Sequence, residues 1–360
     1  MERRAAVGTA KGLFFIEDGE QRGPCFPGER FPAVAMAPDG RVVAASVSEH
    51  WGPTLRLSDD FGQTWTEHDE RSIAFPPGLS WTDQWTDERK PATVVQVWQL
   101  VIASNGDVWA GTEPAALFRS RDAGRSFELV RPLWDHPHRE QWAPGGGGLG
   151  LHTILLDPGD EERLHVAIST GGVYRSDDGG DSWTARNQGV ASPGVDPAPE
   201  FGQCVHKVDR DAADPDVLYL QNHGGLYRTD DRGDSWVSIA EGLPSDFGFP
   251  MVTHRHRGGT AFAIPLDYDL GRIVPEGRCR VYRTTDAGGS WEALTEGLPQ
   301  EGAFLTVLRD AFCADAGDPL GLWFGTRSGH VFHSEDDGDH WRCAAEMLPD
   351  VLCVRAVAVG

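Results

Sequence analysis

One acidic motif occurs six times along the 360-residue chain and constrains its fold more than any other feature. Each copy reads Ser/Thr-x-Asp-x-Gly-x-Ser/Thr followed by an aromatic residue, except that the last has His340 in place of the second hydroxyl. The copies are SDDFGQTW at 58, SRDAGRSF at 120, SDDGGDSW at 176, TDDRGDSW at 229, TTDAGGSW at 284 and SEDDGDHW at 334. Successive copies start 62, 56, 53, 55 and 50 residues apart, which predicts a repeat architecture.

The aspartate of each motif is expected to belong to the frame of the protein. Its carboxylate can accept hydrogen bonds from the backbone N–H groups of a turn, and the glycine two residues later accepts a positive φ. The aromatic residue then returns to the sheet and fills space between repeats. Because six equivalent turns cannot all be active sites, we assign structural roles to the six motif aspartates, Asp60, Asp122, Asp178, Asp231, Asp286 and Asp336.

Each repeat is predicted to contain four short β-strands. In the third repeat these are LHTILLD, RLHVAIS, GVYRSD and SWTARN, which combine alternation with β-branched and aromatic residues. The C-terminal VLCVRAVAVG matches a first strand and part of a second, whereas the N-terminal AVGTAKGLFFIEDGE matches a second and a third. We therefore expect the two chain ends to complete one blade of a ring, giving seven blades, with six or eight as alternatives.

The six motifs resemble the Asp-box, or BNR, repeat, and the chain resembles BNR or sialidase-type β-propellers over essentially its whole length. The resemblance implies an all-β propeller of four-stranded antiparallel blades, and the match of the two chain ends sets the expected number of blades at seven, formed as one domain by residues 1–360. It does not imply one function, because the family includes sialidases, other glycosidases, sorting receptors and assembly factors.

Composition excludes several kinds of partner. The formal charge of −23 repels nucleic acid phosphates and anionic lipid, and no segment approaches the roughly 20 apolar residues of a membrane span. The N-terminus lacks the apolar stretch of a signal peptide, so we expect a cytoplasmic protein. The six cysteines include no C-x-x-C pair and are expected to be reduced thiols.

The long loops are expected to lie on one face of the ring. In an antiparallel blade, the first-to-second and third-to-fourth turns share one face, and the second-to-third turns and the links between blades share the other. The links at 71–92, 131–149 and 187–203 and the insertion from Pro265 to Arg278 are the longest, and all fall on the second face. A ligand site is therefore expected at this mouth of the central channel.

Three histidines are predicted to meet at that mouth. His152 and His206 begin innermost strands of adjacent blades, and His223 follows a second strand, with Glu113, His136 and His138 able to approach them. Imidazoles with a carboxylate suit a divalent transition metal such as zinc or iron. The alternative is that these histidines hydrogen-bond across the blades or bind an anion when protonated.

A glycosidase is a second interpretation, because hydrolysis needs two carboxyl groups across the glycosidic bond. Carboxylates expected on the long-loop face are Glu49, Asp83, Asp87, Glu113, Asp267 and Asp269, and tryptophans there are Trp51, Trp81, Trp85 and Trp142. The catalytic candidates are Glu113, Asp267 and Tyr268. Ligand-binding candidates are Arg30, Trp98, Arg327 and Arg355.

Sialidase activity is not expected, although RFPAVAMAPDGRVVAA at 30 is similar to the start of that family and would make Arg30 a carboxylate-binding arginine. The family uses three such arginines and a tyrosine nucleophile, whereas Tyr268 is the one tyrosine placed on a long-loop segment. Three functions therefore stay open: a funnel that binds a small molecule or carbohydrate, with or without a metal; a glycoside hydrolase; and a non-catalytic scaffold that docks a protein on the long-loop face.

Overall fold

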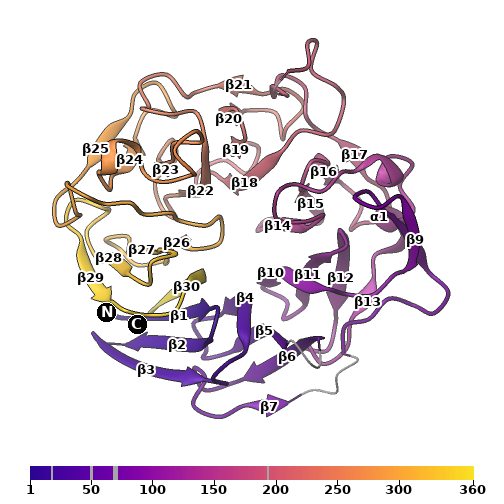
Figure 1. Ribbon diagram of the computed structural model, residues 1–360, viewed down its shortest axis with the longest axis horizontal. Helices are drawn as coiled ribbons and strands as arrows, with labels where there is room; N and C mark the ends of the chain where they lie inside the picture. Colours follow the sequence, from indigo (N-terminus) through magenta and orange to yellow (C-terminus); the bar gives the residue numbers. More distant parts are fainter. Residues whose placement is uncertain (18, 49–51, 68–71, 193) are drawn as a thin grey trace.

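The computed structural model describes residues 1–17, 19–48, 52–67, 72–192 and 194–360, and its regular structure is almost entirely β-strand. The strands form seven four-stranded antiparallel sheets, which Figure 1 shows as blades around a central axis. The predicted all-β, seven-bladed propeller is confirmed. Two predicted loop residues, Glu49 and Trp51, lie outside the described residues.

Six blades each come from one continuous stretch of chain, with the strands in chain order from the axis outward. The first blade contains β4 (Arg30–Met36), β5 (Val42–Ser48), β6 (Gly52–Ser58) and β7 (Thr66–Glu67). The second contains β10 (Gln96–Ile102), β11 (Val108–Glu113), β12 (Ala116–Ser120) and β13 (Glu128–Leu129). The third contains β14 (Leu151–Asp157), β15 (Asp160–Ile168), β16 (Gly172–Ser176) and β17 (Thr184–Ala185). The fourth contains β18 (Val205–Arg210), β19 (Leu218–Asn222), β20 (Gly225–Thr229) and β21 (Val237–Ser238). The fifth contains β22 (Gly248–Thr253), β23 (Ala261–Pro265), β24 (Val281–Thr284) and β25 (Glu292–Leu294). The sixth contains β26 (Phe312–Ala314), β27 (Leu322–Gly325), β28 (Val331–Ser334) and β29 (Arg342–Ala345).

The links between blades carry the remaining elements. A hairpin of β8 (Ser80–Asp83) and β9 (Glu88–Pro91) follows the first blade, and α1 (Arg131–Trp134) and the 3-10 turn η1 (Arg139–Gln141) follow the second. A further 3-10 turn, η2 (Pro275–Gly277), lies within the fifth blade. In the described part of the chain, no helix has the length and apolar character needed to cross a membrane.

The closing blade combines both ends of the chain. Its inner strand is β30 (Val351–Val359), and β1 (Glu2–Thr9), β2 (Gly12–Glu17) and β3 (Glu20–Cys25) complete it outward. β1 and β30 pair antiparallel from Glu2 opposite Val359 to Thr9 opposite Val351, and Figure 1 places the two termini together. The predicted joining of the two ends is confirmed, and the N-terminal stretch also supplies the fourth strand, β3.

Neighbouring blades pack face to face around the axis. One apolar cluster, for example, joins Ala33, Val43 and Leu55 of the first blade to Val97 and Phe118 of the second. An inner strand such as β18 therefore has all six residues buried, because a neighbouring blade covers each of its faces. This packing fixes where each inner strand begins, and those starting points surround one end of the central channel.

The six motif aspartates occupy the turns between third and fourth strands, which we call the acidic corners. At Asp178, Oδ1 accepts hydrogen bonds from Ser182 N and Ser176 Oγ, both at 2.8 Å, and Oδ2 accepts one from Ser182 Oγ at 2.6 Å. The hydrogen bond from the Ser182 hydroxyl is the largest cause of the lowered pKa of Asp178. The other five aspartates accept the same pair of bonds from the residue four positions later.

The acidic corners lie on the face of the first-to-second turns. In five blades a backbone N–H of the corner donates to a carbonyl at or beside that turn, as Gly179 N does to Glu162 O at 2.8 Å. His254 Nε2 lies 3.1 Å from Asp337 of the sixth corner, which places His254 on this side as well. We call this side the corner face.

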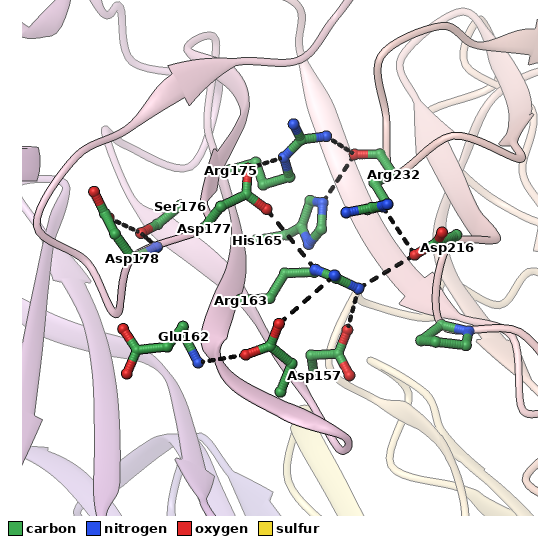
Figure 2. Close-up of polar contacts among 12 residues, drawn as sticks. Asp157, Glu162, Arg163, His165, Arg175, Ser176, Asp177, Asp178, Asp216 and Arg232 are labelled. Carbon is green, nitrogen blue, oxygen red and sulfur yellow. Dashed lines mark hydrogen bonds and ion pairs between the residues drawn. The ribbon is translucent and has the colours of Figure 1, made fainter.

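Ion pairs on the corner face join neighbouring blades, and Figure 2 shows the junction of the third and fourth. Arg163 Nη1 lies 3.0 Å from Asp157 Oδ2 and 3.2 Å from Asp216 Oδ1, and Arg232 Nε lies 2.9 Å from the same Asp216 oxygen. His165 Nε2 donates to the carbonyl oxygen of Arg232 at 3.0 Å. Cations and carboxylates on this face therefore neutralise one another.

Candidate functional site

A local irregularity places side chains at the end of the channel opposite the corners. The strand register shifts between Val97 and Gln99 in β10, between Leu151 and Thr153 in β14, and between Val205 and Lys207 in β18. The residues inside these shifts are Trp98, His152 and His206. A bulge leaves its extra residue out of the hydrogen-bond ladder and re-aims its side chain. Three adjacent blades therefore carry a bulged residue at equivalent positions.

Two neighbouring cavities, of ≈ 360 Å³ and ≈ 310 Å³, lie at this end of the channel, and together we call them the funnel. Their lining residues come from the starts of inner strands, from links, and from second-to-third turns such as those holding Ala10, His223 and Arg327. The funnel therefore opens on the face opposite the acidic corners. The residues that line both cavities are Trp98, Gly146, Gly147, Phe249, Arg272 and Arg309.

A larger cavity, of ≈ 550 Å³, lies away from the axis between residues 185–189 and 196–200. Its one cationic side chain, Arg186, pairs with Asp234 at 3.1 Å. None of its lining residues is a histidine or a cysteine. Among the described residues, arginines without a carboxylate partner, two histidines and one cysteine line the funnel instead.

Three arginines of the funnel face it without a carboxylate at ion-pair distance among the described residues. Arg30 Nη1 donates to Gln96 Oε1 at 2.6 Å, and Arg309 Nε donates to the carbonyl oxygen of His206 at 3.1 Å. Arg272 lies 5.8 Å from the ring centroids of both Phe249 and Tyr268. Their remaining N–H donors are available to a ligand.

The carboxylates nearest the funnel are already paired. Asp310 Oδ1 lies 2.7 Å from Lys207 Nζ and 2.8 Å from Arg355 Nη2, and Asp350 lies 2.7 Å from Arg327. Burial alone would raise the pKa of Asp310, but Lys207 and Arg355 lower it below its ordinary value. Of the four predicted ligand-binding residues, Arg30, Trp98 and Arg327 line the funnel. The fourth, Arg355, lies farther along the channel, where it lines a separate cavity of ≈ 190 Å³.

Glu113 lies under the wall of the funnel. Its Oε2 accepts hydrogen bonds from Gln96 Nε2 at 2.9 Å and from Trp98 Nε1 at 3.1 Å. The glycine-rich link lies against both side chains: a Cβ on Gly148 would come within 2.2 Å of Glu113 Oε1, and one on Gly150 within 2.5 Å of Trp98 Nε1. Glycine at these positions lets the backbone form the funnel wall.

Cys204, His206 and His223 offer three metal-ligating atoms that all lie within 4.8 Å of one another. Cys204 Sγ is 3.6 Å from His206 Nε2, and His206 Nδ1 bonds the carbonyl oxygen of Gly248 at 2.6 Å. Burial lowers the pKa of His206 to about 3, with Arg309 adding to the effect, and burial also lowers the pKa of His223. Both rings are therefore neutral at pH 7, as metal ligation requires.

His152, predicted to be the third histidine of this set, lies outside it. Its side chain is fully buried, its Nδ1 lies 3.2 Å from Thr153 Oγ1, and its Nε2 has no protein hydrogen-bond partner among the described residues. Burial lowers its pKa well below the ordinary value. His206 is near enough to add to this lowering of the His152 pKa, but His152 is not in the group of ligand atoms.

The remaining loop residues have other surroundings. Tyr268 lines the funnel with its ring edge-on to His223 at 5.0 Å, whereas Asp267 Oδ1 accepts the N–H of Leu270 at 3.0 Å and closes a turn. His138 stacks on Phe201 at 3.9 Å, away from the funnel, and His136 lies beside it. The other predicted loop side chains divide as follows: Trp142 is buried, Trp85 is exposed, Trp81 packs on two apolar clusters, Asp83 pairs with Lys90, and Asp87 and Asp269 are exposed.

Cys204, Arg272 and Arg309 were not among the residues predicted from the sequence. The sequence did hold one signal for Cys204, because this thiol lies two positions before His206, which was already a predicted metal ligand. No local signal marked Arg272 and Arg309, which reach the funnel from an insertion in the fifth blade and from the link before the sixth.

No family model matches the chain. In sequence it is similar to a xyloglucanase of Paenibacillus sp., at 25% identity over 197 residues that cover 52% of this chain and 18% of the relative. It is also similar to the xyloglucanase Xgh74A of Acetivibrio thermocellus, at 27% identity over 203 residues, covering 53% and 22%. The aligned part is thus about half of this chain and about a fifth of each relative.

Two solved structures share the fold at low sequence identity. An ancestral GH74 enzyme superposes with a TM-score of 0.54 and 16% identity, covering 87% of this chain and 38% of that one. YCF48 bound to a D1 peptide superposes with a TM-score of 0.53 and 14% identity, covering 95% and 85%. The chain is thus a seven-bladed β-propeller that shares its fold with both an enzyme and a peptide-binding protein.

Proposed function

We propose that the funnel binds an anionic ligand without transforming it, so that the protein acts as a receptor or assembly module. One observation carries this proposal: Arg30, Arg272 and Arg309 line one opening without a carboxylate partner among the described residues, in a chain with a formal charge of −23. Uncompensated guanidinium groups in a recess attract and orient an anion through charge-assisted hydrogen bonds. The proposal needs no metal.

Glycoside hydrolysis fits the funnel less well. A glycosidase keeps one carboxyl group protonated while a second acts as nucleophile or base. Asp310 is held in ion pairs with Lys207 and Arg355 that favour its charged form, Asp350 is paired with Arg327, and Glu113 lies behind the glycine-rich link. The sequence similarity to xyloglucanases covers only about half of the chain, so we do not transfer their activity.

The proposed ligand carries a carboxylate. The planar fork of arginine matches carboxylate geometry, while Trp98 and Phe249 offer apolar walls for the body of the ligand. A propeller of the same fold is solved with a peptide bound, which favours a partner peptide, and the arginines of the funnel favour one with a C-terminal or side-chain carboxylate. An acidic sugar presents the same group. We further propose that binding takes place in the cytoplasm, where the six free thiols stay reduced.

Calorimetric titration tests the proposal with matched pairs of probes at constant ionic strength. The pairs are glucuronate with glucose, and acetyl-Ala-Phe with its C-terminal amide. We expect the acid of at least one pair to bind and its neutral twin to bind at least tenfold more weakly, because hydrogen bonds to charged groups contribute about 1.5 to 3 kcal/mol each. Which acid binds distinguishes a sugar from a peptide.

Variants locate the binding. Arg272→Gln and Arg309→Gln should each weaken the binding acid at least tenfold, whereas Arg121→Gln, an exposed arginine of the second blade, should leave it unchanged. Equal binding of acid and neutral twin, or unaltered binding in both funnel variants, would show that the arginines do not form the site. Hydrolysis of xyloglucan oligosaccharide by the purified protein would overturn the non-catalytic assignment.

A further inference from the structure

Beyond anion binding, we propose that Cys204, His206 and His223 form a binding site for a borderline divalent cation, and that Zn²⁺ is the metal that fits them. The three residues come from the link before β18, from β18 itself and from the turn after β19, so one blade supplies all of them. Thiolate and imidazole ligands favour zinc over hard cations such as Mg²⁺ and Ca²⁺.

The distances suit tetrahedral coordination. With Zn–S of about 2.3 Å, Zn–N of about 2.0 to 2.1 Å and an angle of about 109°, sulfur and nitrogen ligands lie about 3.6 Å apart. Cys204 Sγ and His206 Nε2 are 3.6 Å apart. His223 must approach by about 1.5 Å at most to complete the set, since no two of the ligand atoms are more than 4.8 Å apart.

The surroundings of His206 prepare it to be a ligand. A carbonyl oxygen only accepts hydrogen bonds, so the 2.6 Å contact with Gly248 O places the ring hydrogen on Nδ1. Nε2 then presents its lone pair toward Cys204 and His223. Metal-binding histidines use this arrangement, in which the second nitrogen donates to a carbonyl and fixes the ring.

The set leaves one coordination position open. Three protein ligands with a free fourth position are typical of catalytic or substrate-binding zinc, whereas structural zinc has four protein ligands. All three ligands line the ≈ 310 Å³ cavity of the funnel, so that position faces the ligand space. A bound metal would therefore take water or the anionic group of a ligand there.

A bound metal would change the charge of this part of the funnel, which Arg272 and Arg309 also line. Binding of Zn²⁺ releases the thiol proton, and the thiolate cancels one of the two positive charges. The remaining charge, together with Arg272 and Arg309, favours an anion at the open position.

Cobalt titration of the full chain tests the site, because tetrahedral Co²⁺ absorbs visible light and a Co²⁺–thiolate bond adds a charge-transfer band. Protein that has been reduced and freed of metal by a chelator should bind one equivalent of Co²⁺ with both signals, and one equivalent of Zn²⁺ should abolish them. Cys204→Ser should lose the charge-transfer band, and His223→Ala should bind at least tenfold more weakly.

Two substitutions outside the funnel serve as controls. Cys343→Ser removes an exposed thiol of β29 and His340→Gln an exposed imidazole of the sixth corner, and neither should change the titration. Circular dichroism checks that each variant is folded. Failure of the wild type to bind either metal, or unchanged binding in folded Cys204→Ser and His223→Ala, would overturn the site. Carboxylate binding should persist in metal-free Cys204→Ser, so the two proposals fail separately.

Discussion

The two faces of the ring differ in whether their arginines are paired with carboxylates. On the corner face, Arg163 meets Asp157 and Asp216 while the motif aspartates accept hydrogen bonds from their own turns. On the funnel face, Arg30, Arg272 and Arg309 make no ion pair in the part of the chain that the structure describes, and their contacts are to Gln96, to the carbonyl oxygen of His206 and to aromatic rings. Charges that neutralise each other hold blades together, whereas cations left without counterions are free to bind something else.

The difference is also one of sequence. The corners repeat the same residues every 50 to 62 positions, because each must make the same turn. The bulged positions are less regular: Trp98, His152 and His206 occupy them, and Trp98 and His206 line the funnel whereas His152 does not. Repetition therefore marks the frame, whereas the side chains of the proposed ligand site come from positions that differ between blades.

The largest expected effect concerns the buried ion group below the funnel. Asp310→Asn should lower the free energy of unfolding by about 3 to 5 kcal/mol, because it leaves Lys207 and Arg355 without their shared carboxylate in a buried site. Urea unfolding followed by fluorescence measures the change. The control is Asp350→Asn, whose partner Arg327 is exposed, and it should cost less than about 1 kcal/mol. Equal losses would show that burial does not distinguish the two groups.

A matched pair of arginine substitutions tests the contrast between the faces directly. Arg163→Gln should destabilise the fold by about 2 kcal/mol, because it removes one charged hydrogen bond within the third blade and one to Asp216 of the fourth. Arg272→Gln should change the free energy of unfolding by less than about 0.5 kcal/mol, since it breaks no ion pair among the described residues. The same urea experiment applies, and a reversed order would contradict the assignment of frame and site.

Removal of one acidic corner is expected to have a smaller effect. Asp178→Ala should cost about 1 kcal/mol, because three hydrogen bonds are lost at an exposed turn. Asp181→Ala, an exposed aspartate of the same turn, should stay within about 0.5 kcal/mol of wild type. Both variants should bind the acidic probe as the wild type does. Weaker binding in Asp178→Ala would place the corners within the ligand site.

The smallest expected effect is a change with acid pH in how much one corner aspartate contributes to the free energy of unfolding. Hydrogen bonds from Thr64 lower the pKa of Asp60 to about 2, and those from Ser126 and Ser120 outweigh burial and lower that of Asp122 to about 2. A carboxylate with a lowered folded pKa stabilises the protein above its unfolded pKa of about 4 and loses that contribution as the pH falls toward 2. The stability difference between wild type and Asp60→Asn should therefore shrink from pH 4 to pH 2 in urea titrations. A constant difference would mean that the pKa is not lowered.

The fold was predictable because the chain repeats the same turn motif in successive blades. Six copies of one turn set the period, and the strand patterns at the two ends could be matched to parts of a single repeat. The count of seven followed from those incomplete ends, which β1 and β30 join in the structure. What the pattern did not give was strand length: SWTARN in the third repeat forms only the two-residue strand β17 (Thr184–Ala185).

The candidate site was less predictable because it depends on single side chains from distant segments. His206 and His223 come together, but His152, at the equivalent position in the preceding blade, is fully buried beside Thr153. His152 and His206 are both buried, but Cys204 and His223 lie beside His206, whereas Thr153 is the hydrogen-bonding neighbour of His152. Arg272 and Arg309 are 37 residues apart in the chain and meet only through the order of the blades.

The pairing of β1 with β30 has a consequence for synthesis of the chain. Thr9 cannot pair with its strand partner Val351 until the ribosome has added the 342 residues that lead to it. At translation rates of about 5 to 20 residues per second, this takes roughly 20 to 70 s, during which the edge of β1 has no neighbour. Leu352 of β30 also lines the funnel. Pairing of β30 with β1 thus covers the exposed edge of β1 and adds Leu352 to the wall of the funnel in the same event.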